Sequence, residues 1–159
     1  MSRYRNLVFL MAVMCMLVSG CGKELEEKDV RLYYQSQGGT ALVTEGHNWE
    51  SNTAREQAEE ALEKLRKPED TVACVSVIPA DVLVTGIDLE GDCVDVNFSQ
   101  EYERMDVSEE ILLRAAVVYS LTQIDGVRSV RFRVSGSPLL DREGAEIGAM
   151  KAEDFVLDI

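Results

Sequence analysis

Hydrophobic and polar residues alternate along two stretches of the chain, residues 30–35 and 129–134. An alternation with a period of two is typical of a β-strand with one buried face. In the first stretch, the expected buried positions are Val30, Leu32 and Tyr34. In the second, the expected buried positions are Val130, Phe132 and Val134. Arg131 and Arg133 then face outward from the same strand.

Residues 83–98 predict a β-hairpin, with Glu90-Gly91 as its two-residue turn. In this register Leu89 lies opposite Asp92, and Leu83 lies opposite Phe98. One face of the hairpin is then mostly apolar and belongs to the core. The opposite face is polar and includes Cys93, Asp95 and Asn97.

Helical spacing predicts two helices. The first begins with a capping box, Thr53 and Glu56, and ends before Pro68. Its predicted inner face consists of Ala54, Ala58, Ala61, Leu62 and Leu65. The second begins at Asp106 or Ser108 and ends at Asp125-Gly126, and its predicted inner face consists of Ile111, Leu112, Ala115, Val118, Tyr119, Thr122 and Ile124. The tail after residue 138 predicts a short hairpin and a closing strand near Phe155.

The first 20 residues have the pattern of a bacterial signal peptide. Arg3 and Arg5 precede an uncharged apolar run, 7–17, which is too short to span a bilayer. Val18-Ser19-Gly20-Cys21 resembles the lipobox of bacterial lipoproteins. The resemblance implies cleavage between Gly20 and Cys21 and acylation of the Cys21 sulfur. We therefore expect a signal peptide at 1–20, a lipid-bearing tether at 21–29 and one domain at 30–159.

Charge and composition narrow the class of protein further. The chain has 16 basic and 29 acidic residues, which gives a formal net charge of −13. This charge argues against a general nucleic-acid binder, and the 46% of hydrophobic residues argues against intrinsic disorder. The acyl chains on Cys21 are the expected membrane attachment, because the acidic body is repelled by anionic lipid. The predicted location is the outer face of the cytoplasmic membrane.

The order and spacing of several segments between Val77 and Gly136 resemble a GerMN domain. Ile78-Pro79 with Val82-Leu83-Val84 resembles the entry to the family's hairpin, and Val94–Ser99 resembles its polar–apolar strand. The segment 118–127, with the sequence VYSLTQIDGV, resembles the end of its helix. Residues 130–136 then resemble the strand that follows. GerMN domains are modules of bacterial sporulation and spore-germination lipoproteins.

This resemblance implies an α+β fold related to ring-building motifs, with two helices packed on one face of a small mixed sheet. It also implies a scaffolding or assembly role in the cell envelope, in sporulation or in germination, and it brings no catalytic residues. The chain differs from the germination protein in having one copy of the domain instead of two. It also carries Asn97 at a position where many members have aspartate or another residue.

Side chains that often carry chemistry give little sign of an enzyme here. His47 has no partner at metal-ligand spacing, so we expect a loop side chain and no metal or other cofactor. The many paired carboxylates reflect the acidic composition and give no indication of acid–base catalysis. Cys74 and Cys93 are either two free thiols, which we favour, or a disulfide.

Two classes of function fit these observations. The first is a tethered interaction module that binds another envelope protein, and the second is a lipoprotein that binds a solute or a cell-wall fragment. The predicted outward face gathers Arg128, Arg131, Arg133, Asp95 and Asn97. These arginines either pair with Asp95 and nearby acids or form a docking surface. We expect no deep pocket in a domain of this size.

Overall fold

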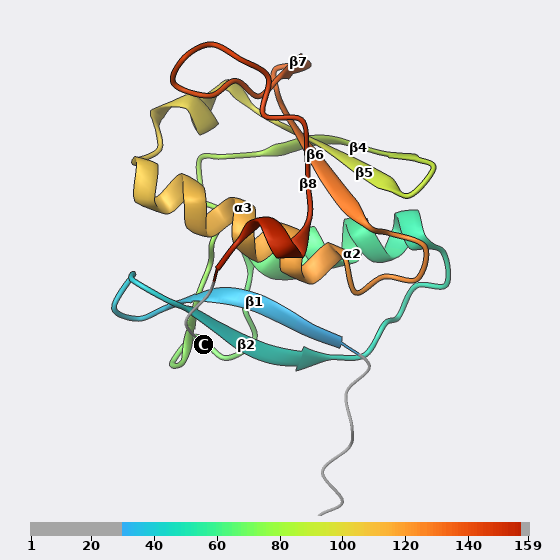
Figure 1. Cartoon of the computed structure of the whole chain (residues 1–159). Coiled ribbons are helices and arrows are strands. Elements are labelled where there is room, and N and C mark those ends of the chain that lie inside the picture. The colour runs from blue at the N-terminus through green and yellow to red at the C-terminus, as the bar shows by residue number, and fades with distance from the viewer. Residues whose placement is uncertain (1–29, 157–159) are drawn as a thin grey trace, which may run out of the picture.

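The alternating stretches form strands, and the computed structural model describes residues 30–156. Two β-sheets enclose two helices (Figure 1). In chain order the elements are β1 (Val30–Ser36), β2 (Leu42–His47), α2 (Ala54–Arg66), β3 (Cys74–Val75), β4 (Val84–Glu90), β5 (Cys93–Phe98), the 3₁₀ helix η1 (Gln100–Arg104), α3 (Val107–Leu121), β6 (Ser129–Val134), β7 (Ser137–Pro138), β8 (Ala149–Met150) and the 3₁₀ helix η2 (Ala152–Asp154).

The first sheet is antiparallel, with the strand order β2-β1-β3. Val30, Leu32 and Tyr34 of β1 are buried, as their alternation predicts. The edge of β1 beyond the short strand β3 is closed by side chains of the helix region. The backbone amide of Arg31 donates to Gln123 Oε1 at 3.0 Å, and Gln123 Nε2 donates to the Arg31 carbonyl at 2.6 Å. These bonds satisfy backbone groups that a neighbouring strand would otherwise pair.

The second sheet is mixed and has the order β4-β5-β6-β7, with β8 also paired to β6. β4 and β5 are antiparallel, whereas β5 and β6 are parallel, so the connection between them must cross over. This crossover contains η1 and α3, and it brings α3 against the inner face of the sheet (Figure 1). The apolar residues of β6 are buried on that face: Val130, Phe132 and Val134.

α2 matches its prediction closely. Thr53 and Glu56 form the capping box, with the Glu56 amide donating to Thr53 Oγ1 and the Thr53 amide donating to the Glu56 carboxylate. The helix ends at Arg66, before Pro68. Four of its five predicted inner residues are buried, namely Ala58, Ala61, Leu62 and Leu65. Its opposite side is acidic and faces solvent.

α3 is buried on more sides than its sequence pattern predicts. Ala115, Val118 and the following Ile124 are buried as expected, whereas Ile111 is 46% exposed. Further buried positions are Leu113, Ala116, Val117, Ser120 and Leu121. The reason is that α3 contacts β1 of one sheet and β6 of the other. A helix packed between two sheets must bury apolar residues on two sides, whereas the predicted stripe covers only one.

The hairpin register differs from the prediction. Glu90 pairs with Cys93, Leu89 with Val94 and Ile87 with Val96, so the turn residues are Gly91 and Asp92. Gly91 has a φ of +65°, which glycine adopts at low cost. A bulge between Val84 and Gly86 then places Val84 opposite Phe98. Leu83, which the predicted register buries, is 47% exposed.

The tail is partly as predicted. An isolated bridge between Leu140 and Glu146 closes a short hairpin. The closing strand is β8, which pairs with β6 through Met150 and Val130, and it lies before the predicted position at Phe155. Phe155 instead packs near Tyr119, whose hydroxyl donates to the Phe155 carbonyl at 2.9 Å. The whole is an α+β fold with both helices on the inner face of the mixed sheet, which confirms the predicted fold class.

Candidate interaction face

The outer face of the mixed sheet brings together four of the five predicted interaction residues. In the parallel register of β5 and β6, Asp95 lies beside Arg131 and Asn97 lies beside Arg133. Because side chains alternate along a strand, these four point away from the helices. Arg128 precedes β6 and stands at one end of this face, with its Nε 3.8 Å from Asp92 Oδ2. We call these five residues the interaction face.

Asp95 is the electrostatic centre of the interaction face. Its Oδ2 is 3.0 Å from Arg131 Nη1 and 3.7 Å from Arg133 Nε, and its side chain is only 8% exposed. Arg131 Nη1 also lies 3.3 Å from Glu90 Oε2. The nearby Asp95 carboxylate raises the pKa of Arg131 above its usual value, so this arginine is charged at any working pH. The arginines therefore pair with local acids, one of the two arrangements that the sequence left open.

The second carboxylate oxygen of Asp95 has no such partner. Asp95 Oδ1 is buried and makes no hydrogen bond within the described residues. An unpaired buried acceptor is uncommon, because it has lost water without gaining a protein donor. Arg131 and Arg133 remain about one third exposed, and each guanidinium has five N–H donors. The unused hydrogen-bonding capacity at the surface therefore belongs to the N–H donors of Arg131 and Arg133, because Asp95 Oδ1 itself is buried.

Asn97 has a structural role on the same face. Its Nδ2 donates to Thr85 Oγ1 at 2.6 Å, and the Gly136 amide donates to its Oδ1 at 2.8 Å. The Asn97 side chain thereby links the bulge of β4 to the turn after β6 by hydrogen bonds. An aspartate at this position has no amide to donate to Thr85, so only an asparagine makes both of these hydrogen bonds when an aspartate would be ionised.

Neither the burial of Asp95 nor the contribution of Glu90 was predicted from the sequence. The predicted register placed Glu90 in the turn, whereas it is the last residue of β4 and reaches Arg131. A signal was present in the sequence, because Asp95 is the one charged residue within the apolar strand Cys93–Phe98. A carboxylate at such a position needs cations on the adjacent strand.

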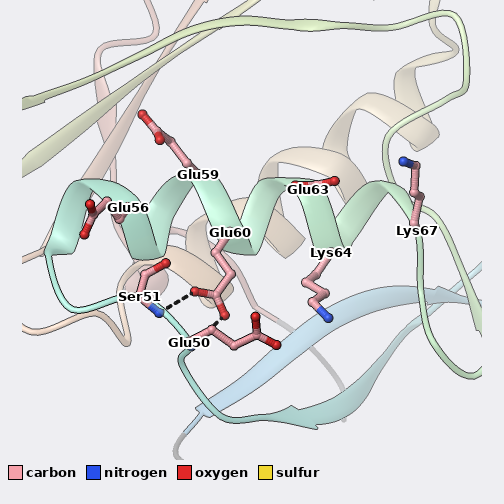
Figure 2. A pocket seen from close by; sticks show the side chains of 8 residues that line it. All are labelled: Glu50, Ser51, Glu56, Glu59, Glu60, Glu63, Lys64 and Lys67. Carbon is pink, nitrogen blue, oxygen red and sulfur yellow. Dashed lines mark hydrogen bonds between the residues drawn. The ribbon is translucent and has the colours of Figure 1, made fainter.

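An acidic hollow of about 520 Å³ runs along the solvent side of α2 (Figure 2). Figure 2 shows Glu60 turned toward the segment before the helix, where its carboxylate accepts bonds from the Glu50 and Ser51 amides at 3.1 and 3.0 Å. His47 Nε2 lies 2.5 Å from Glu60 Oε1. Burial alone raises the pKa of Glu60, but these hydrogen bonds outweigh it and lower the pKa below the usual value. Glu60 is therefore occupied in fixing this segment.

His47 is the last residue of β2 and contacts Trp49 edge-on, with 5.4 Å between the ring centroids. Within residues 30–156 no cluster of His, Cys, Asp and Glu has the geometry of a metal site. Cys74 and Cys93 are both free and buried, as favoured from the sequence, although Cys93 was expected on a solvated face. Among the described residues there is no helix of the length and hydropathy that crossing a membrane requires. Gly20 and Cys21 lie outside the described residues.

Comparison with known proteins agrees with this fold. The family Germane, described as sporulation and spore germination, matches residues 31–140. The first GerMN domain of the sporulation protein GerM from Bacillus subtilis is 22% identical with a TM-score of 0.65, and the match covers 79% of this chain and 98% of that domain. A search of curated proteins finds no match.

Two further solved structures share the fold. The tandem GerMN domains of GerM are 23% identical with a TM-score of 0.61, and the match covers 79% of this chain but 46% of the tandem. A putative lipoprotein from Clostridium perfringens is 16% identical with a TM-score of 0.53, and the match covers 79% of this chain and 87% of that one. These likenesses define the class as a GerMN-type α+β domain. The chain belongs to the Germane family of sporulation and spore germination.

Proposed function

We propose that this protein is a membrane-tethered, extracytoplasmic lipoprotein whose GerMN domain binds another envelope protein as a scaffold. Family membership supports a role in sporulation, germination or a related assembly of the cell envelope. The lipobox-like segment ending at Cys21 supports anchoring on the outer face of the cytoplasmic membrane. In this proposal the protein has no catalytic role and carries no cofactor.

The observation that carries the proposal is the charged cluster at the centre of the interaction face. Arg131 and Arg133 are fixed by Asp95, so their guanidinium groups are oriented before a partner arrives. Less side-chain entropy is lost on binding when arginines are held in place, and their forked donors suit carboxylates and carbonyls of a partner.

The anchor is tested separately from the docking. In the variant Cys21→Ser we expect the signal peptide to remain or the protein to become soluble, because the acylated sulfur is gone. Membranes washed with salt retain the wild-type chain, whereas detergent releases it. Retention of a correctly cleaved Cys21→Ser protein in the membrane would contradict the lipid anchor.

Docking is tested by crosslinking from native membranes and identification of the partner. Arg133→Ala removes one guanidinium group from the interaction face while Arg131 still pairs with Asp95, so we expect the fold to be preserved. Arg142→Ala is the matched control, because Arg142 is exposed in the loop between β7 and β8. We expect the partner band to weaken several-fold with Arg133→Ala and to stay with Arg142→Ala. Equal bands in both variants would exclude docking through this face.

A further inference from the structure

An edge of the first sheet is covered by side chains, whereas the β4 edge of the second sheet is open. One edge of β1 is closed by Gln123 and by Ser120, whose Oγ accepts from the Tyr33 amide at 3.0 Å. β4 is also an edge strand, and within the described residues only β5 pairs with it. An uncovered edge presents backbone donors and acceptors that another strand can pair.

The register shows which backbone groups of β4 are free. In a hairpin with a two-residue turn, the pair next to the turn exchanges hydrogen bonds, which here is Glu90 with Cys93. Alternate residues of β4 therefore bond to β5, and the residues between them direct their N–H and C=O groups outward. These residues are Ile87 and Leu89.

A groove of about 270 Å³ runs beside this edge, between α2 and β4. Its lining is mixed: Leu62 of α2 and the half-buried Val84 and Ile87 of β4 are apolar, whereas Glu59, Glu63, Arg66 and Lys67 are charged. Leu89 is 36% exposed farther along the strand. An extended segment added to β4 would direct every second side chain toward this groove, where Leu62, Val84 and Ile87 offer apolar contacts.

The opposite side of the same edge is acidic. Asp88 and Glu90 occupy the outward positions of β4, and their side chains are 75% and 66% exposed. Asp88 forms a pair with Arg55 of α2 at 3.6 Å, and both groups are more than half exposed, so an incoming strand displaces this pair at low cost. The outward side chains of an added strand then lie next to acidic groups and are favoured when basic.

We propose that the free edge of β4 and the groove beside α2 bind an extended segment of a partner protein as an added β-strand, with apolar residues toward the groove and lysine or arginine toward Asp88 and Glu90. This inference rests on the proposed function, because it names the segment that the scaffold binds. It places the bound segment next to the interaction face, since Glu90 also contacts Arg131.

A second copy of the chain suits this edge less well than a basic segment. Two copies paired about Asp88 place like carboxylates opposite each other, and a chain with a formal charge of −13 repels itself. Charged residues and bulges are also the features that natural edge strands use against unwanted pairing. The carboxylates of Asp88 and Glu90 therefore disfavour an acidic strand and favour a basic one, whereas the bulge at Val84–Gly86 limits pairing at the other end of β4 whatever the charge of the added strand.

The test uses the full chain in detergent and a short synthetic peptide that alternates valine with lysine. The matched peptide alternates valine with glutamate. We expect the lysine peptide to bind and to slow hydrogen exchange at the amides of Ile87 and Leu89, because these donors become paired. Failure of the lysine peptide to bind, or protection elsewhere without protection at these two amides, overturns the inference.

Two variants locate the binding. Ile87→Pro removes an outward N–H without removing a bond to β5, so we expect at least about tenfold weaker binding. Asp88→Lys reverses an exposed charge and leaves the backbone intact, which provides a test even if the proline variant does not fold. It weakens binding of the lysine peptide and strengthens binding of the glutamate peptide. Glu143→Lys, an equal charge change in the loop before β8, is the control and leaves both affinities unchanged.

Failure of this inference can be told apart from failure of the proposed function. If Asp88→Lys and Ile87→Pro both leave the native crosslinked band intact, the proposed binding of an envelope protein is retained, but the partner does not bind at the β4 edge. If the peptide binds as expected but wild-type membranes yield no crosslinked partner, the edge is confirmed and the scaffold role fails. Self-association of the wild-type chain that Ile87→Pro abolishes overturns the basic-segment proposal in favour of a second copy.

Discussion

The two faces of β5 and β6 are built from the same strands but depend on different interactions. Toward the helices, both strands present only apolar side chains, and all of them are buried: Val94, Val96, Phe98, Val130, Phe132 and Val134. On the interaction face they present two arginines, an asparagine and an aspartate. Asp95 is 7% exposed, nearly the same as the 6% of Val134 on the inner side.

Burial alone therefore does not distinguish the two faces. On the inner face, burial contributes stability through the apolar area removed from water. On the interaction face, burial of Asp95 costs free energy that Arg131 and Arg133 must offset. The inner face should tolerate apolar exchange and no charge, whereas the interaction face should be sensitive to any change in the sign of its charges.

The largest effect is expected for Phe132→Asp. Phe132 is 2% exposed and stacks near Phe98 with 6.3 Å between the ring centroids, so the variant buries an unpaired carboxylate and loses an aromatic contact. We expect a loss of more than about 4 kcal/mol in the free energy of unfolding, a large part of the total for a domain of this size. Phe132→Leu is the control and costs about 1–2 kcal/mol. Urea unfolding followed by circular dichroism measures both, and equal midpoints for Phe132→Asp and wild type would refute the inner-face assignment.

The next largest effect is expected for Arg131→Glu. The substitution removes the nearest cation of Asp95 and places a like charge beside it and beside Glu90. We expect a loss of about 2–3 kcal/mol, less than for a fully buried pair because Arg131 is about one third exposed. Arg131→Lys restores the charge and recovers most of the loss. Unchanged urea midpoints for Arg131→Glu would show that Asp95 is solvated and that this face does not depend on its ion pairs.

Much of this comparison was predictable from the sequence. The two-residue period of a strand assigned the inner and outer residues of β6 correctly, because one sheet face is core and a slip by one residue would invert it. The register of the hairpin was less well defined. Glu90-Gly91 and Gly91-Asp92 both contain a glycine and both preserve the apolar face, so the pattern could not choose between them.

Tertiary context explains the remaining errors. The bulge that turns Leu83 outward depends on Thr85 and on Asn97 of the neighbouring strand, which no local pattern contains. The buried sides of α3 depend on a first sheet whose position on the far side of the helix could not be inferred from periodicity. The central place of Asp95 likewise depends on the parallel register with β6, which juxtaposes residues 36 positions apart.

A moderate effect is expected for Asn97→Ala, which distinguishes hydrogen bonds from charge on the interaction face. The variant loses the bonds to Thr85 Oγ1 and from the Gly136 amide without changing the charge around Asp95. We expect a loss of about 1–2 kcal/mol in the free energy of unfolding. Asn97→Asp keeps the bond from Gly136, so it should lose less at low pH than at neutral pH, where a second carboxylate lies near Asp95. A loss for Asn97→Ala as large as that for Arg131→Glu would show that hydrogen bonds outweigh ion pairs on this face.

The smallest effect on stability is expected for Arg128→Ala. Arg128 is 80% exposed and its Nε is 3.8 Å from Asp92 Oδ2, an exposed pair that contributes little to folding. We expect the free energy of unfolding, measured by urea denaturation, to change by no more than about 0.5 kcal/mol. Arg128 therefore separates the two roles of its face, because its side chain is free to serve a partner without supporting the fold. The same variant tested in native membranes should weaken the crosslinked partner band while its fold stays intact. A destabilisation comparable to that of Arg131→Glu would mean that the charged network of Asp95 extends to the end of the sheet, and Arg128 would then belong to the structural part of the face.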